Sequence, residues 1–177
     1  MRLLARIRDG DSRAFDELYR IYQPRLSRFL RNFTRRSQVA EEVLNDTLMT
    51  VWERPDGFRG ASKLSTWIFG IAYRKAIKAT RKPDEPVADP EADAQASLEK
   101  GPEELFAHQR AQALLMQALD GLSAEHRAVV DLTYFHEMEY REIADILGCP
   151  VDTVKTRMFY ARRKLRSRIE GGPADWL

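Results

Sequence analysis

Residues 140–168, YREIADILGCPVDTVKTRMFYARRKLRSR, predict two helices joined by a tight turn. Apolar residues lie on one side of the first helix, and Gly148 ends it because glycine reaches a left-handed backbone without a Cβ penalty. Pro150 suits the first turn of the second helix. The inner face of that helix repeats apolar residues at helical spacing: Val154, Met158, Ala161 and Leu165. Two helices joined by a glycine turn form a helix-turn-helix.

The outer face of the second helix is basic. It carries Lys155, Arg157, Arg162, Arg163, Lys164, Arg166 and Arg168. A recognition helix in the major groove needs such a face, because phosphates flank the groove on both sides. A surface helix that is merely basic is the alternative for this stretch taken alone.

Charge is unevenly distributed along the chain, whose net charge is only +2. Residues 1–82 hold 18 basic and 9 acidic side chains, residues 83–104 hold 1 and 8, and residues 105–177 hold 10 and 10. Seven of those last ten basic side chains lie in residues 151–170. Two basic zones separated by an acidic tract indicate binding to a polyanion.

Apolar residues recur with helical period almost throughout, and no convincing strand pattern appears. The sequence predicts an all-α fold of two small helical domains joined by a flexible, acidic, Pro-rich linker, with the helix-turn-helix in the second domain. We place the first domain at residues 1–82, the linker at 83–102, the second domain at 103–170 and a tail at 171–177. Pro24 is expected to kink the first long helix or to break it for one turn.

The first domain contains two contrasting surfaces. The helix that ends near Trp52 has an acidic outer side, which is either an ordinary solvated face or a side turned to a basic protein partner. A later helix, from about Ser65 to Lys82, has a basic outer side, and aromatic residues gather near it. They are Trp52, Phe58, Trp67, Phe69 and Tyr73. This combination suits single-stranded nucleic acid, whose flipped bases need a stacking surface. Trp52 and Trp67 also lie on apolar stripes, which favours a place in the core for both.

The sequence predicts no enzyme, no cofactor and no metal site. It has no P-loop, no dinucleotide-binding glycine pattern and no nucleophile elbow, and its three histidines lack a metal-ligand rhythm. A metal enzyme built on the histidines is therefore the weakest alternative. The cluster formed by Asp131, His136, Glu137 and Glu139 is expected to be a solvated acidic face.

The sequence predicts a cytoplasmic protein without membrane insertion. Its single cysteine, Cys149, cannot form an internal disulfide, which fits a reducing compartment. Residues 1–10 lack the apolar run of a signal peptide. No segment approaches the ~18–20 apolar residues that a membrane span needs.

The order of the motifs carries more information than any one of them. An acidic-faced helix, AEEVLNDTLMTVW (residues 40–52), is followed by TWIFGIA (66–72) and the basic helix. After the linker come LSAEHRAVVDL (122–132), YREIA (140–144) and TVKTR (153–157). In this order the chain resembles the extracytoplasmic-function (ECF) sigma factors, the compact two-domain class of bacterial sigma factors, along nearly its whole length.

The resemblance implies that the partners are promoter DNA and core RNA polymerase. The β′ clamp helices of the polymerase would be bound by Glu41, Glu42, Asn45, Asp46 and Glu53. The minus-ten promoter element would be recognised and melted by Arg59, Ser62, Lys63, Trp67, Arg74, Lys75, Lys78 and Arg81. The second domain would contact the β flap and read the minus-35 element with Thr153, Lys155, Thr156, Arg157, Tyr160, Arg162 and Arg163. The linker would run through the RNA exit region, and an anti-sigma factor would cover the polymerase-binding faces.

The chain departs from the family pattern at the melting helix. The family commonly has Asn where Arg74 stands and Asp where Lys78 stands, so this helix is more basic than usual. The pair Asn45-Asp46 replaces a frequent Gln-Glu pair. The alternative function is a stand-alone helix-turn-helix regulator that binds duplex DNA without polymerase, but it leaves the acidic-faced helix unexplained.

Overall fold

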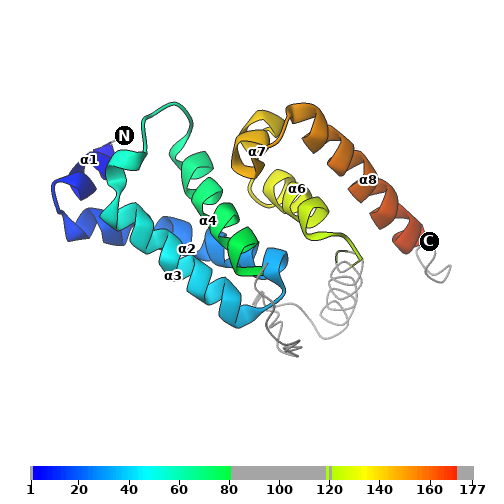
Figure 1. Ribbon diagram of the computed structural model, residues 1–177, viewed down its shortest axis with the longest axis horizontal. Helices are drawn as coiled ribbons and strands as arrows, with labels where there is room; N and C mark the ends of the chain where they lie inside the picture. Colours follow the sequence, from blue (N-terminus) through cyan, green and yellow to red (C-terminus); the bar gives the residue numbers. More distant parts are fainter. Residues whose placement is uncertain (1, 81–118, 120, 171–177) are drawn as a thin grey trace, which may run out of the picture.

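The computed structural model describes residues 2–80, 119 and 121–170, and in these ranges every regular element is a helix (Figure 1). The helices are α1 (Arg2–Arg8), α2 (Ser12–Thr34), α3 (Ser37–Glu53), the 3-10 turn η1 (Pro55–Gly57), α4 (Leu64–Thr80), α6 (Ala124–Tyr134), α7 (Tyr140–Leu147) and α8 (Val151–Glu170). The all-α prediction is therefore confirmed for this part of the chain. None of these helices is both long and apolar enough to cross a membrane. The predicted linker at 83–102, the start of the second domain at 103, the tail at 171–177 and Arg81 lie outside the described residues.

Of the two expected effects of Pro24, a kink or a one-turn break, the break does not occur, because α2 runs through the proline. A proline inside a helix costs about 3 kcal/mol, because it removes a backbone hydrogen bond and its ring crowds the preceding turn. Leu18, Tyr22 and Leu26 form one buried face that continues across the proline. Each such side chain contributes about 1.5–3 kcal/mol when it is fully buried. The packing of this continuous face therefore outweighs the cost of the proline.

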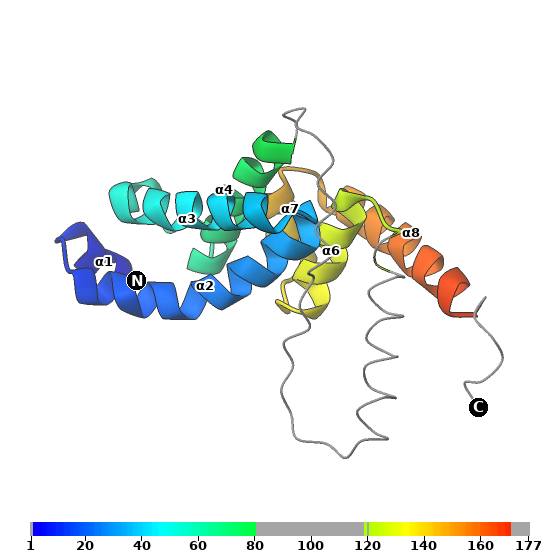
Figure 2. The same ribbon diagram turned by 90° about the horizontal axis from the view of Figure 1, so that it is seen from below.

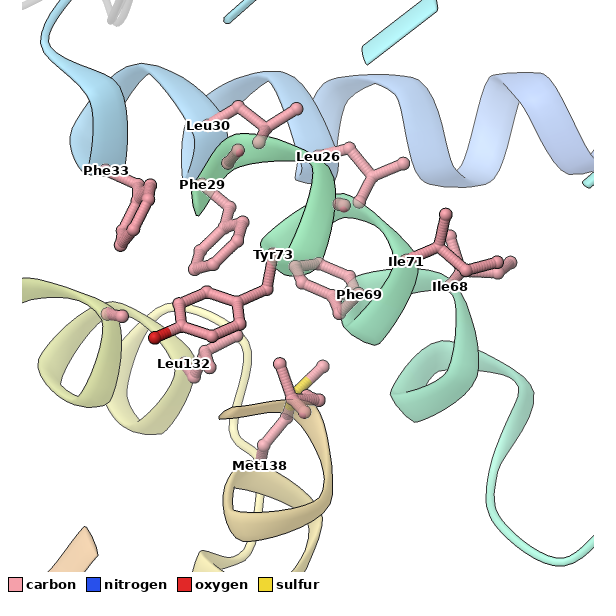
Figure 3. Close-up of a cluster of buried hydrophobic side chains, with 14 of the residues drawn as sticks. Leu26, Phe29, Leu30, Phe33, Ile68, Phe69, Ile71, Tyr73, Leu132 and Met138 are labelled. Carbon is pink, nitrogen blue, oxygen red and sulfur yellow. The ribbon is translucent and has the colours of Figure 1, made fainter. Parts of the chain in front are cut away.

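Helices α2, α3 and α4 pack around a core of aromatic and aliphatic side chains (Figures 1 and 3). Helix α2 contributes Phe29 and Leu30, and α4 contributes Ile68 and Phe69, all completely buried. The ring centroids of Phe29 and Phe69 lie 5.5 Å apart with the planes inclined by 59°, which is within the range that aromatic pairs prefer. The apolar stripes of these helices thus face one another.

The second half of the chain contains the predicted helix-turn-helix. Gly148 follows α7 with a φ of 65°, in the left-handed region that favours glycine. On α8, Val154, Met158 and Ala161 are buried, and Leu165 is half-buried at the edge of the same face. Helix α6 packs against α8 and completes this half.

The two halves of the described chain pack onto each other, with α6 and α7 against α2 and α4 (Figure 2). Figure 3 shows Leu132 and Met138 on the side of the core that faces Tyr73 of α4. A polar contact crosses the same boundary, because Arg127 Nη2 donates a hydrogen bond to the carbonyl oxygen of Phe33 at 3.2 Å. The halves therefore share one continuous hydrophobic core.

Candidate nucleic-acid interface

Helix α8 presents most of the predicted minus-35 residues to solvent. Its buried residues, Val154 and Ala161 among them, hold one side of the helix against the core. The exposed members of the predicted set are Lys155, Thr156, Tyr160, Arg162 and Arg163. The half-buried members are Thr153 and Arg157. The arrangement leaves a basic face free to enter a groove of DNA.

At least three of the exposed cations on α8 have interactions within the protein: Lys155, Arg162 and Arg166. Lys155 Nζ lies 3.0 Å from Asp152 Oδ1. Arg162 Nε donates a hydrogen bond to the hydroxyl of Tyr134 at 3.0 Å. Exposed pairs of this kind contribute about 0–1 kcal/mol. They can therefore be exchanged for DNA phosphates at little cost.

Arg157 lies at the boundary between α8 and α4. Its Nη1 is 4.0 Å from the sulfur of the half-buried Cys149. Burial raises the pKa of the Tyr73 hydroxyl on α4, and the positive charge of Arg157 opposes that rise. The first half of α8 thus faces α4 in this arrangement.

The segment of residues 58–63, called here the minus-ten loop after its predicted role, begins directly after η1. The ring centroids of Phe58 and Trp67 lie 5.5 Å apart. A Cβ on Gly57 would lie 3.2 Å from the Trp67 ring, so glycine allows η1 to approach the ring closely. The predicted DNA contacts in the loop are exposed or half-buried: Arg59, Ser62 and Lys63.

The basic row on α4 is only partly free. Arg74 and Lys78 are exposed. The guanidinium of Arg74 folds back over Gly70, where an added Cβ would lie 3.2 Å from Nη1. Lys75 is half-buried, and its Nζ lies 3.5 Å from Asp46 Oδ2 on α3. Lys75 therefore joins the predicted DNA-binding face to the predicted polymerase-binding face.

Only some of the aromatic residues near α4 are placed to stack on bases. Phe69 is 0% exposed and Tyr73 is 8% exposed, so both belong to the core and are not stacking surfaces in this arrangement. Trp52 is half-buried and packs onto α2. The half-buried pair of Phe58 and Trp67 remains beside the minus-ten loop.

The second half supplies a carboxylate to the minus-ten loop. Glu142 Oε1 lies 3.1 Å from Lys63 Nζ and accepts a hydrogen bond from the Thr66 hydroxyl at 3.2 Å. Burial alone would raise the pKa of Glu142, but the N–H of Glu139, Lys63 and Thr66 together hold that pKa below its ordinary value. The carboxylate is therefore charged at neutral pH. In this arrangement it pairs with Lys63, one of the predicted DNA contacts.

The expectation of a solvated face is wrong for Asp131 and His136, which are 3% and 8% exposed. His136 Nε2 lies 3.0 Å from Asp131 Oδ1, and Asn32 Nδ2 donates a hydrogen bond to Asp131 Oδ2 at 2.6 Å. The His136 ring also packs against Phe29 and Phe69, with centroid distances of 6.4 and 4.7 Å. Buried polar groups need partners, and here the hydrogen-bond donor to Asp131 Oδ2, Asn32, comes from the other half. The two exposed members of the expected face are Glu137 and Glu139.

The described ranges contain no group of three or more His, Cys, Asp or Glu side chains that could hold a metal ion.

The predicted polymerase-binding residues all lie on the exposed side of α3. They are Glu41, Glu42, Asn45, Asp46 and Glu53. Val43, Leu44 and Leu48 are buried on the opposite side. Met49 is 54% exposed and gives the acidic side an apolar centre. Such a surface suits a basic protein partner that adds a small apolar contact.

Sequence reasoning did not single out two residues of this site, Thr66 and Glu142. Glu142 stands three positions after Glu139, a spacing typical of the first turn of a helix, and Glu139 N–H indeed bonds to its carboxylate at 3.1 Å. That local signal concerns only α7. The contact between Glu142 and Lys63 joins distant parts of the chain, so no local pattern indicates it.

Comparison with known proteins finds relatives along almost the whole chain. The family sigma-70 region 2 matches residues 18–84, and the family sigma-70, region 4 matches residues 112–165. The ECF RNA polymerase sigma factor RpoE of Cereibacter sphaeroides is 31% identical over 94% of this chain and 93% of its own. The RNA polymerase sigma-H factor of Pseudomonas aeruginosa is 28% identical over 95% of this chain and 92% of its own.

A solved structure is similar over most of the chain as well. It is the sigma factor RpoE of Bartonella quintana in complex with the anti-sigma factor NepR. The identity is 25%, the TM-score is 0.68, and the match covers 88% of this chain and 96% of the other.

Proposed function

The chain belongs to the ECF sigma factors, and we propose which function each of its two halves performs. Members of this family are transcription initiation factors that bind core RNA polymerase and direct it to particular promoters. Residues 1–82 bind the β′ clamp helices and recognise and melt the minus-ten element. Residues 103–170 contact the β flap and bind the minus-35 element through α8. Residues 83–102 link the two, and residues 171–177 form a tail.

One observation supports this division most directly. Each half turns a chemically distinct surface to solvent on the side opposite its buried residues: an acidic one on α3 and a basic one on α8. The acidic surface repels DNA and favours a basic protein partner, whereas the basic surface favours phosphates. Neither surface is needed to hold the core together.

The two halves have to separate when the protein binds a promoter. The minus-ten and minus-35 elements lie about 25 base pairs apart, which is about 85 Å at 3.4 Å per base pair. In the packed arrangement α7 contacts α4 directly. A molecule of this shape cannot place the minus-ten loop and α8 on both elements at once. Separation also releases Lys63 from Glu142.

Replacing Glu142 by alanine is expected to strengthen the binding of the free protein to single-stranded DNA by about two- to fivefold. The partly exposed pair with Lys63 contributes up to about 1 kcal/mol, and its loss frees the lysine for a phosphate. Fluorescence anisotropy with a labelled oligonucleotide measures the change. Asp145→Ala removes an exposed charge from the same helix and serves as the control. An equal gain in both variants would show that only net charge matters.

Replacing Glu42 and Glu53 by lysine is expected to weaken binding to core polymerase at least about tenfold, because both would meet a basic partner surface with the wrong charge. These positions are chosen because they leave the pair of Asp46 and Lys75 intact. A pull-down with core polymerase measures the loss. Asp16→Lys with Asp145→Lys, also at exposed positions, is the matched control. Wild-type protein that binds duplex DNA tightly but does not associate with core polymerase would overturn the proposed function itself.

We further propose that an anti-sigma factor holds this chain inactive by covering its polymerase-binding faces, in the cytoplasm where core polymerase acts. The Bartonella quintana relative, which is bound to an anti-sigma factor, supports the idea. Purification of the protein from its native host, followed by identification of its partners, tests both points. Polymerase subunits and an inhibitor are both expected among the partners, each bound to separate molecules of the protein.

A further inference from the structure

We propose that Arg8 of α1 is a positioning residue for DNA melting, because it fixes the turn from which the minus-ten loop emerges. The inference rests on the proposed role of that loop in capturing the melted strand. It adds to the DNA-opening apparatus a helix, α1, that lies outside the residues matched by sigma-70 region 2, which begin at position 18.

The guanidinium of Arg8 spans η1 and the first residue of the loop. Its Nε lies 2.9 Å from Asp56 Oδ1. Its Nη2 donates hydrogen bonds to the carbonyl oxygens of Phe58 at 3.1 Å and of Pro55 at 3.4 Å. The ion pair is exposed and contributes little. The bonds to the two carbonyls are charge-assisted, and they set the direction in which the chain leaves the turn.

Trp67 holds the other side of the same turn. Its ring packs against Phe58 and lies so close to Gly57 that a Cβ there would be only 3.2 Å away. The turn is therefore fixed by a cation from α1 and by an aromatic ring from α4. Because Phe58 is bound on both sides, Arg59 and the rest of the loop start from a defined position.

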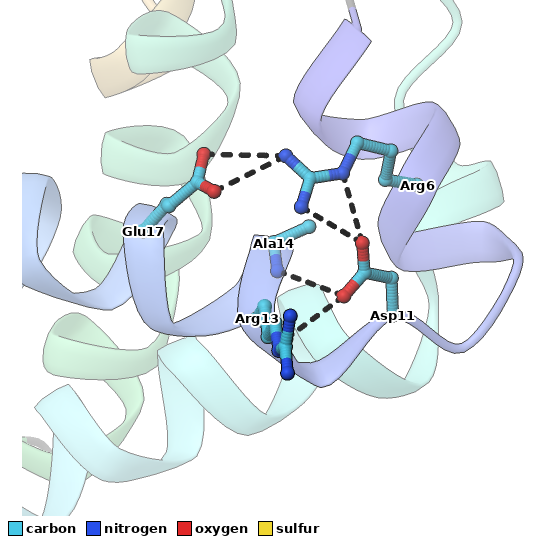
Figure 4. Close-up of polar contacts among 5 residues, drawn as sticks. All are labelled: Arg6, Asp11, Arg13, Ala14 and Glu17. Carbon is cyan, nitrogen blue, oxygen red and sulfur yellow. Dashed lines mark hydrogen bonds and ion pairs between the residues drawn. The ribbon is translucent and has the colours of Figure 1, made fainter.

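Helix α1 is itself firmly seated, as a positioning element must be. Leu4 and Ile7 are buried in the core. Arg6 pairs with Asp11 at 2.8 Å and with Glu17 at 3.1 Å (Figure 4). Asp11 in turn accepts hydrogen bonds from backbone N–H groups in the first turn of α2, and mainly because of Arg6 the pKa of its carboxyl is lowered. The packing of α1 therefore fixes the backbone position from which the Arg8 side chain extends.

The experiment compares Arg8→Ala, Arg8→Lys, Lys63→Ala and the control Arg13→Ala, which removes an exposed arginine nearby. Each full-length protein is combined with core polymerase on a promoter that the wild type selects from a randomised duplex library. Permanganate reactivity of minus-ten thymines follows melting, and a pull-down measures core binding. We expect Arg8→Ala to slow melting about tenfold, in line with the loss of charge-assisted bonds, with core binding unchanged. The melting rate of Arg8→Lys should fall between those of the wild type and Arg8→Ala, because one ammonium nitrogen cannot replace both Nη2, which bonds the two carbonyls, and Nε, which pairs with Asp56.

The outcomes separate this inference from the function on which it rests. Slower melting in Arg8→Ala and Lys63→Ala, but not in Arg13→Ala, supports both. Slower melting in Lys63→Ala alone overturns the role of Arg8 and leaves the loop assignment standing. Unchanged melting in Arg8→Ala and Lys63→Ala overturns both. Loss of core binding in Arg8→Ala, or no partial rescue by Arg8→Lys, would show a merely structural role and overturn the inference.

Discussion

Replacing Lys155 and Arg163 by glutamate is expected to reduce transcription from a minus-35-dependent promoter at least about 100-fold, with binding to core polymerase unchanged. Both side chains are exposed on α8. A good bidentate contact from such a side chain to a base typically contributes ~1–3 kcal/mol of discrimination, and the substitution also introduces repulsion from the phosphates. These two residues are better targets than Arg157, which is half-buried and faces α4.

Reconstituted transcription measures the effect, and duplex binding at several salt concentrations gives its cause. If the variant loses two phosphate contacts, the slope of log K against log salt should become shallower by about 2. Arg20→Glu with Arg31→Glu makes the same change in net charge at exposed positions of α2. Equal losses in the two double variants would contradict the assignment of α8 to the minus-35 element.

Replacing Phe69 by alanine is expected to lower the free energy of unfolding by about 3–5 kcal/mol. The side chain is completely buried and its ring contacts Phe29, His136 and the guanidinium of Arg25, so the substitution removes packing from both halves and leaves a cavity. Urea denaturation followed by far-ultraviolet circular dichroism measures the loss.

The matched control for Phe69 is Phe159→Ala, because Phe159 is 62% exposed and should change stability by less than about 0.5 kcal/mol. A small effect at Phe69 would mean that the two halves do not share a core in solution. Two separate unfolding transitions in the wild type would lead to the same conclusion.

Local features of the fold could be predicted from the sequence where short-range chemistry decides them. Gly148 adopts the predicted left-handed conformation, and Val154, Met158 and Ala161 form the predicted inner face. Pro24 shows the limit of such reasoning. Its effect depends on how strongly the rest of α2 is packed, which no rule about proline contains.

In the candidate site too, features set by local sequence could be predicted, whereas features set by contacts between distant parts of the chain could not. The exposed acidic side of α3 follows from helical periodicity. The burial of Asp131 and His136 does not, because it requires the packing of α6 and α7 onto α2 and α4. The engagement of Lys63 by Glu142 has the same origin. A pattern of charges indicates what a surface can bind, but not whether another part of the chain already covers it.

The polar cluster of Asp131, His136 and Asn32 limits how freely halves can be exchanged between family members. A chimera that joins this first half to a foreign second half can keep an intact helix-turn-helix. It must also provide an acceptor for the Asn32 amide and a flat side chain that fits beside Phe29 and Phe69. Grafts that ignore this requirement leave an unsatisfied amide and an open aromatic surface. The two halves of this protein therefore cannot be exchanged independently of the residues at the boundary between them.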